Sequence, residues 1–290
     1  MDFIQGEKFI HLQNENIVYC ATHDVNQFFR SCQINKPFIL ITHNSDGYIT
    51  DNPRYVNMLE PHHHGDVSLM PQNLHKWFGC MVEYQNEKIV SIPIGVPNEM
   101  HSHNNIYKGS KFTEIMINIS NQKNDKYSDK LLFVNFRISN NYSERIAAYK
   151  AVEGKEFCTF SEKLFTEEQL SHHTEVSPPI YTEPYEFFAN EISKHKFVLC
   201  PIGNGLESHR LWETLYIGSI PITRRNINYS FYEDKLPILM VDDWSEITED
   251  FLIQKYSEIT NKLENGFYNL EMLNFSYWKN LILNESKKIS

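Results

Sequence analysis

The stretch that decides the fold is "KFVLCPIGNGLESHRLWETLYIGSIPITRR", residues 196–225. It begins with a short apolar run, passes through a turn that contains Gly203 and Gly205, becomes amphipathic and ends in a second apolar run. Glycines permit a tight turn and a close approach of the backbone, and Gly218 is of the type that commonly ends a helix. The stretch therefore predicts a buried strand, a turn, a helix over about residues 207–217 and a second strand.

The predicted helix has one apolar face and one ionisable face. Leu211, Trp212 and Leu215 share the first, whereas the ionisable side chains are His209, Arg210 and Glu213. The N–H groups at a helix N-terminus and a guanidinium both suit a phosphate, and a carboxylate can accept two hydrogen bonds from a ribose diol. The alternative is an ordinary surface ion pair between Arg210 and Glu213, which contributes only about 0.2–0.5 kcal/mol.

Strand and helix patterns continue on both sides of this stretch. Residues 17–46 read as strand, helix and strand, which is typical of a βαβ unit with parallel strands. Residues 119–130 are polar and lack an apolar period, and a strand (130–136) and a helix (144–152) follow. The sequence therefore predicts an α/β protein with two successive halves. Further predicted elements are strands at 88–98 and 237–243 and helices at 184–195, 247–264 and from Asn274 onward.

Composition narrows the possible partners. The formal net charge is −10, and proteins whose main ligand is nucleic acid are usually basic, so we expect no nucleic-acid partner.

Five scattered cysteines without a CxxC pair argue against a disulfide framework and a structural zinc site. No apolar run approaches the ~18 residues of an integral membrane segment. The first residues lack the pattern of a signal peptide, so we expect a cytoplasmic protein, with peripheral membrane association left open.

The opening stretch resembles the carboxyl-terminal motif of exostosin-like glycosyltransferases and, more distantly, a similarly placed motif of fucosyltransferases. The matching residues are Phe197, Leu199, Pro201, Gly203, Asn204, Gly205, Arg210, Trp212, Glu213, Leu215, Gly218, Pro221 and Ile222. The resemblance implies the GT-B fold, in which two Rossmann-like domains face a cleft. Family members often have an acidic residue with Thr-His before the arginine, where this chain has residues 206–209, so the resemblance assigns no role to Glu207 or His209.

The resemblance also implies a division of the chain. Residues 1–125 would form an acceptor-binding Rossmann-like domain, residues 126–270 a nucleotide-sugar-binding one, and residues 271–290 a helix that packs back toward the first. The implied reaction transfers a hexosyl, pentosyl or fucosyl group from a UDP- or GDP-linked donor to a hydroxyl of a glycan or glycoconjugate. It would invert the anomeric centre and need no metal cofactor, because a helix dipole and arginines would stabilise the leaving group.

Two other functions stay open. The chain could be a non-catalytic nucleotide-sugar or glycan-binding protein of the same fold, or a sugar-nucleotide hydrolase or phosphorylase.

The predicted donor-binding residues come from two segments. Asn135 and Arg145 follow the first strand of the second half, near a helix start where Asn141 and Glu144 have the spacing of a capping pair. An ordinary polar turn with a solvated arginine is the alternative. In the family, Arg210 would face the diphosphate and Glu213 the ribose or the sugar. The complete predicted donor set is Gly203, Asn204, Gly205, Arg210, Glu213, Arg145 and Asn135.

A polar segment after the strand of the first half supplies the acceptor-side candidates. Inverting sugar transfer needs a base that takes the proton of the acceptor hydroxyl. Asp46 is the predicted base, with His43 as the second candidate and Glu99 as a third. The alternative is that Asn44, Ser45 and Asp46 only cap a turn and the element that follows.

Two further motifs suggest metal ligands at first sight. Adjacent histidines in "PHHHGD" (61–66) would point to opposite faces of a strand, and no HxxxH spacing follows. His101 and His103 have no assignable carboxylate partner. The acids of "VDDW" (241–244) are typical of a strand end followed by a helix cap. We therefore predict no metal site.

Overall fold

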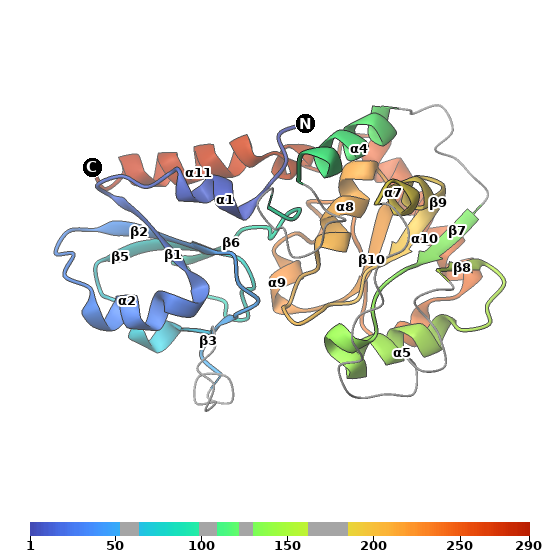
Figure 1. Ribbon diagram of the computed structural model, residues 1–290, viewed down its shortest axis with the longest axis horizontal. Coiled ribbons are helices and arrows are strands. Elements are labelled where there is room, and N and C mark those ends of the chain that lie inside the picture. Colours follow the sequence, from blue (N-terminus) through green and yellow to red (C-terminus); the bar gives the residue numbers. More distant parts are fainter. Residues whose placement is uncertain (53–63, 99–108, 122–129, 162–184) are drawn as a thin grey trace.

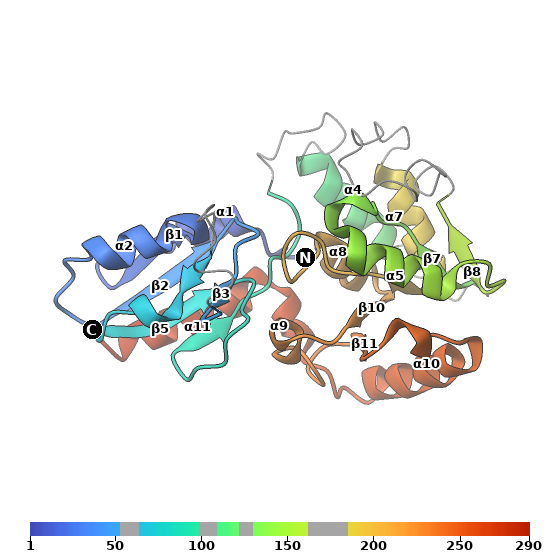
Figure 2. The ribbon, with the colours of Figure 1, turned by 90° about the horizontal axis from the view of Figure 1, so that it is seen from below.

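The computed structural model describes residues 1–52, 64–98, 109–121, 130–161 and 185–290. Figures 1 and 2 show two α/β units side by side, each built on its own sheet of parallel strands. The predicted pair of Rossmann-like units is therefore confirmed.

The first unit has a four-stranded sheet in the order β1-β2-β5-β6, parallel throughout. Its strands are β1 (Ile17–Ala21), β2 (Phe38–His43), β5 (Leu74–Gly79) and β6 (Ile89–Ser91). All residues of β2 are buried, because this central strand has neighbours on both edges and cover on both faces. Helix α2 (Val25–Ser31) connects β1 to β2 and buries Val25 and Phe29.

The second unit has a five-stranded parallel sheet in the order β11-β10-β9-β7-β8. Its strands are β7 (Lys130–Val134), β8 (Cys158–Phe160), β9 (His195–Leu199), β10 (Ile220–Arg224) and β11 (Leu239–Val241). The strand that opens the decisive stretch, β9, lies at the centre. Its carboxyl end therefore meets those of β7 and β10 at one edge, which is where open parallel sheets bind ligands.

Helices cover both faces of the second sheet. Helices α5 (Tyr142–Val152) and α10 (Glu249–Glu264) share one apolar core with the strands, and α7 (Tyr185–Ser193) and α8 (His209–Ile217) lie in the other. Helix α4 (Gly109–Asn121) packs against α7 and α8, although it precedes the predicted boundary in the sequence. Smaller elements are α1 (Gly6–Ile10), β3 (Ile49–Thr50), β4 (Gly65–Asp66), α9 (Ile227–Ser230) and the 3₁₀ turns η1 (Thr22–Asp24), η2 (Val67–Leu69), η4 (Ser139–Asn141), η6 (Trp244–Glu246) and η7 (Leu270–Leu273).

The C-terminal helix α11 (Phe275–Lys287) runs along the first unit, next to α1 (Figure 1). The Nε2 atom of His75 in β5 lies 3.1 Å from a carboxylate oxygen of Glu285. The backbone N–H of Phe275 donates to the carbonyl of Asp2 at 2.8 Å. The N-terminal segment is thereby joined to the start of α11.

The two units are packed against each other by one continuous apolar core. Its buried members include Ile4 and Phe78 of the first unit and Trp212 and Tyr232 of the second. The Tyr216 hydroxyl accepts a hydrogen bond from the N–H of Ile4 at 3.0 Å. The relative placement of the units is therefore fixed by side-chain packing. Within the described residues, no helix is both long and apolar enough to cross a membrane.

Candidate active site

The side chain of Arg145 supports the turn between β9 and α8. Its Nε donates to the Ile202 carbonyl at 2.9 Å and its Nη1 donates to the Arg137 carbonyl at 2.7 Å. A Cβ at Gly203 would lie only 3.0 Å from Nη2 of the same side chain, so the glycine allows the guanidinium to lie beside the turn. Arg145 therefore holds the carbonyls of Ile202 and Arg137 in place.

Asn141 also supports the turn, because its Nδ2 donates to the Gly203 carbonyl at 2.9 Å. The predicted capping pair is wrong. Asn141 makes no side-chain cap bond, and the carboxylate of Glu144 pairs with Arg224 at 2.9 Å instead. An ordinary solvated turn is also excluded, since Glu144 and Arg145 are both buried.

The helix α8 is buried more completely than an amphipathic pattern predicts. Every residue from Leu211 to Ile217 is buried, because α4 and α7 cover the face expected to meet solvent. Arg210 and Glu213 do pair, with Nε and Oε2 3.1 Å apart, but their side chains are only 15% and 7% exposed. The pair is thus interior, and the Arg210 guanidinium lies over the Phe188 ring. The end of the helix at Gly218, with φ of 89°, is as predicted.

Several predicted donor residues meet at the carboxyl end of β9. Burial raises the pKa of the Cys200 thiol to about 12, while the charges of Arg210, Glu213 and Arg145 act on it with smaller effects. Asn135 follows Val134, which pairs with Leu199, so it lies beside Cys200. Among the described residues the Nδ2 of Asn135 is buried without a hydrogen-bond partner. The structure therefore brings both arginines, the carboxylate and an amide to one edge of the sheet.

The other end of the turn faces the first unit. A Cβ at Gly205 would lie 2.8 Å from Cε of Met81 and 3.5 Å from Cα of Asp46. The Tyr48 hydroxyl donates to the carbonyl of Asn204 at 3.0 Å. One turn thus lies next to Arg145 at Gly203 and next to Met81 and Asp46 of the first unit at Gly205.

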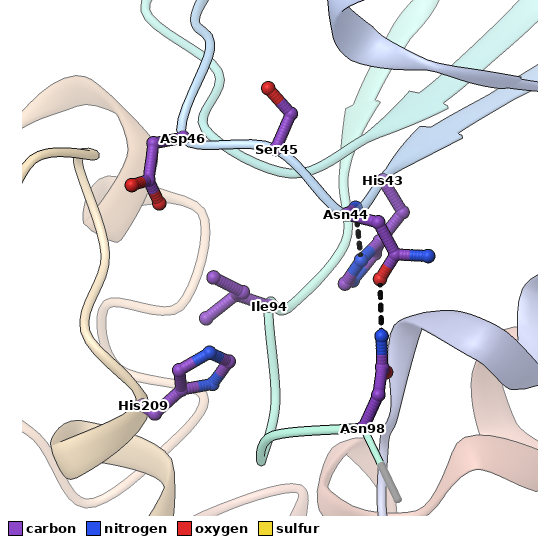
Figure 3. A pocket seen from close by; sticks show the side chains of 7 residues that line it. All are labelled: His43, Asn44, Ser45, Asp46, Ile94, Asn98 and His209. Carbon is purple, nitrogen blue, oxygen red and sulfur yellow. Dashed lines mark hydrogen bonds between the residues drawn. The ribbon is translucent and has the colours of Figure 1, made fainter. Parts of the chain in front are cut away.

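A pocket of about 200 Å³ opens next to this contact and is lined by both units (Figure 3). Figure 3 shows Asp46 and His209 on one flank, with His43, Asn44 and Asn98 on the other and Ile94 between them. The lining residues are His43, Asn44, Ser45, Asp46, Ile94, Asn98 and His209. Both predicted acceptor-side residues are therefore in one place, next to a histidine of the second unit.

His43 is placed as a structural residue of this pocket. Its Nδ1 accepts from the N–H of Asn44 at 2.8 Å, so its Nε2 is the protonated nitrogen and donates to the Pro93 carbonyl at 3.0 Å. Burial lowers the pKa of His43 to about 4, against the opposite effect of the Pro93 bond. Both nitrogens are occupied and the ring is neutral at pH 7, so the geometry favours Asp46 over His43 as a base.

The turn chemistry considered for residues 44–46 is present, but Asp46 takes no part in it. Ser45 Oγ accepts from the N–H of Gly47 at 3.0 Å. Asn44 has φ of 60° and bonds Tyr19 through Nδ2. The exposed carboxylate of Asp46 accepts no hydrogen bond within the described residues.

No role was predicted for the two residues that connect the units here, Glu207 and His209. The segment Pro93–Gly95 presents three successive backbone groups, and each binds one ionisable side chain. The Pro93 carbonyl binds His43, the Ile94 N–H donates to Glu207 Oε2 at 3.0 Å, and the Gly95 carbonyl lies 2.7 Å from Nδ1 of His209. The signal available in the sequence was the acid and histidine just before Arg210.

Glu207 is buried between the units and accepts three hydrogen bonds. Besides Ile94, the donors are Nε1 of Trp212 and Nδ2 of Asn228, both at 2.7 Å. Burial raises the pKa of Glu207 from 4.5 to about 7, and its hydrogen bonds oppose that rise. A carboxylate enclosed in this way orients the units and is not accessible to a substrate.

The remaining candidates are placed as follows. Glu99, His101, His103 and residues 61–63 lie outside the described residues. The acid of "VDDW" is a cap, as predicted: Asp243 and Glu246 form a capping box on η6. In the described ranges, no cluster of three or more His, Cys, Asp or Glu side chains could hold a metal ion.

Comparisons with known proteins agree with this architecture. No protein-family model matches the chain, and no curated protein is similar to it. Among solved structures, a UDP-forming α,α-trehalose-phosphate synthase from Burkholderia vietnamiensis is similar with a TM-score of 0.50 and 10% identity, over 98% of this chain and 77% of that one. The chain has the GT-B fold. A trehalose-6-phosphate protein from E. coli, bound with UDP-2-fluoro glucose, has a TM-score of 0.48 and 11% identity, over 98% and 76% of the chains.

Proposed function

We propose that the chain is a glycosyltransferase, related to the exostosin-like family, that moves a sugar from a nucleotide-diphosphate donor to a glycan hydroxyl. The observation that supports this best is the turn at residues 203–207. It joins the edge of the sheet where Arg145, Arg210 and Glu213 meet to a pocket lined by Asp46. The GT-B fold and a UDP-forming synthase as a structural neighbour fit a nucleotide donor of this kind.

The donor side would work through the pair on α8. The Arg210 guanidinium and the N-terminal N–H groups of the helix would bind the diphosphate, and Glu213 would accept hydrogen bonds from the ribose or sugar. In the present structure these two side chains contact each other at 3.1 Å. A nucleotide would replace part of that ion pair with its own charges, so binding and pair separation would be coupled.

The acceptor would occupy the pocket next to the turn. Its hydroxyl oxygen would attack the anomeric carbon, its proton would pass to a base, and the bond from that carbon to the phosphate oxygen would break. The electron pair leaves with the nucleoside diphosphate, whose charge Arg210 and the helix N-terminus would stabilise without a metal. Attack from the side opposite the leaving group inverts the anomeric centre.

The experiment that tests the donor site is a calorimetric titration with UDP, GDP, CMP and ADP, with and without EDTA. We expect one diphosphate to bind, EDTA to leave its affinity unchanged, and Glu213→Ala to abolish binding. Glu258→Ala is the matched control, because Lys255 and Glu258 form an i,i+3 pair on the surface of α10. Failure of every nucleotide to bind, or equal effects of the two substitutions, would reject the assignment.

The two alternative functions differ in their products. A non-catalytic binding protein would bind a nucleotide and release none from UDP- or GDP-sugars. A hydrolase would release free sugar in the presence of glycan acceptors, whereas a transferase would give a glycosylated acceptor whose anomeric configuration NMR identifies.

A further inference from the structure

His209 is held in a definite orientation in the pocket by a hydrogen bond that joins the two units. It is the first residue of α8 and reaches across to the first unit, where its Nδ1 lies 2.7 Å from the Gly95 carbonyl oxygen. A carbonyl can only accept, so Nδ1 carries a proton and donates it. When the ring is neutral, Nε2 therefore carries the lone pair. Among the described residues, Nε2 has no hydrogen-bond partner.

The carbonyl that orients His209 is itself held in place. Gly95 has φ of 68°, and a Cβ there would lie 2.1 Å from the Ile4 carbonyl oxygen, so only glycine fits. The next residue, Val96, donates its N–H to the same Ile4 carbonyl at 2.9 Å. On the other side, Ile94 is bound to the buried Glu207. The imidazole thus rests on a backbone segment with bonds on both flanks.

The electrostatics of the pocket suit an imidazole that gains a proton. The groups around His209 are Asp46, whose carboxylate lines the same pocket, His43, which burial keeps neutral, and the buried Glu207. Asp46 would stabilise a protonated imidazole, and His43 would not repel it. Asp46 is itself exposed, and its carboxylate is not oriented by any hydrogen bond of the described chain. Proton transfer is most efficient when the base is held in one geometry.

We propose that His209 is a catalytic residue of the transferase described above, whose Nε2 takes the proton of the acceptor hydroxyl. The acceptor oxygen forms its bond to the anomeric carbon as the O–H proton moves to Nε2. The bond between that carbon and the phosphate oxygen breaks, and its electrons leave with the nucleoside diphosphate. The imidazolium, stabilised by Asp46, then returns its proton to solvent. This inference rests on the proposed function, and it moves the role of base from Asp46 to His209.

The test compares His209→Asn with Asp46→Asn. An asparagine side chain places its amide N–H near the position of Nδ1, so His209→Asn keeps the bond to Gly95 and removes Nε2. The assay is release of nucleotide from UDP- and GDP-sugars, with water or a glycan as acceptor, as a function of pH. Isothermal titration with UDP or GDP gives the nucleotide Kd of each variant.

We expect His209→Asn to lower kcat by about 100-fold or more, as loss of a general base does, with the nucleotide Kd changed less than about twofold. The acid limb of the pH-rate profile should be present in the wild type and absent in His209→Asn. Asp46→Asn should lower kcat and retain the limb. If His209→Asn fails to fold, as judged by thermal unfolding, His209→Gln takes its place; it also lacks a basic nitrogen, although it loses the bond to Gly95.

Three outcomes would overturn the proposal. A limb that survives in His209→Asn and disappears in Asp46→Asn would assign the base to Asp46. A loss of nucleotide affinity in His209→Asn equal to its loss of rate would make His209 a phosphate ligand. A wild type that binds no nucleotide and releases none would reject the proposed function itself, and the inference with it.

Discussion

The buried carboxyl of Glu207 gives a quantitative prediction for the contact between the two units. Its pKa is raised from 4.5 to about 7, mainly by burial. A carboxyl with a raised pKa binds its proton more tightly in the folded than in the unfolded chain. Its stabilising contribution is therefore complete below pH 4.5 and is lost as the pH rises to about 7. The difference in pKa corresponds to roughly 3 kcal/mol of unfolding free energy.

Glu207→Gln is the substitution that isolates this effect. A glutamine, like the protonated glutamate, has one acceptor oxygen and one donor group. In both, the oxygen can accept from Ile94 and Trp212 while the donor faces Nδ2 of Asn228. The side-chain amide of Asn228 cannot flip to remove this donor–donor contact, because its Oδ1 accepts from the N–H of Val82 at 2.7 Å. The variant therefore reproduces the low-pH state of the wild type at every pH.

We expect the two proteins to be equally stable at about pH 4 and the variant to be more stable by roughly 3 kcal/mol at about pH 8. Urea unfolding at a series of pH values measures the difference, and a thermal scan should show a shift of about 5–10 °C. Tyr229 and Tyr232, which feel the same charge, have a pKa well above 10 and stay neutral over this range.

The control is Glu207→Ala, which leaves three buried donors without an acceptor. It should be less stable than the wild type at every pH, since each unsatisfied donor costs about 1–3 kcal/mol. The reasoning would be refuted if the difference in unfolding free energy between the wild type and Glu207→Gln did not change between about pH 4 and 8. It would also be refuted by a wild type that becomes the more stable of the two as the pH rises.

Three further substitutions test packing at three separate places in the structure. Gly6→Ala would place a Cβ 2.0 Å from Oδ1 of Asn44, so we expect about 1–3 kcal/mol less stability in urea unfolding and a lower transfer rate. Gly203→Ala would bring a Cβ to 3.0 Å from Nη2 of Arg145, and calorimetry should show about tenfold weaker nucleotide binding, or about 1.4 kcal/mol. Trp278→Ala removes a side chain that is 3% exposed, and urea unfolding should show a loss of about 3–5 kcal/mol.

A strand could be predicted from the sequence where an unbroken run of apolar residues indicates burial. The second strand predicted within residues 17–46 is β2, which is buried throughout. Strand β5 is missing from the predicted elements, because His75 and Lys76 interrupt its apolar pattern. In the structure these side chains reach past the sheet, to the carboxylate of Glu285 and the carbonyl of Glu87. A partner as far along the chain as Glu285 leaves no local signal in the sequence.

The helix α8 shows that the hydrophobic periodicity of a sequence does not by itself predict which faces of a helix are buried. Its pattern predicts one buried face, yet α4 and α7 bury the other face as well. Helix α4 is absent from the predicted elements, although Phe112, Met116 and Ile119 have helical spacing and are buried. Without α4 the pair of Arg210 and Glu213 looks like a surface ion pair; with it, the same pair is interior. Charge in a low-dielectric site interacts more strongly with a ligand of opposite sign, so the missed helix changes the expected chemistry.

Most of the proposed donor residues could be named from the sequence because they lie in one short motif, whereas no role was predicted for Glu207 and His209. Glu207 and His209 bind backbone groups of Ile94 and Gly95. Almost every residue type has the same backbone N–H and carbonyl groups, so the sequence does not indicate which of them will bind a side chain. These two contacts lie on the same turn and helix that hold Arg210. A shift of α8 when a nucleotide separates Arg210 from Glu213 would therefore also move the imidazole of His209. The proposed roles of Arg210 and His209 would link nucleotide binding to the position of the imidazole, and a variant that weakens the Ile94–Glu207 bond should change both.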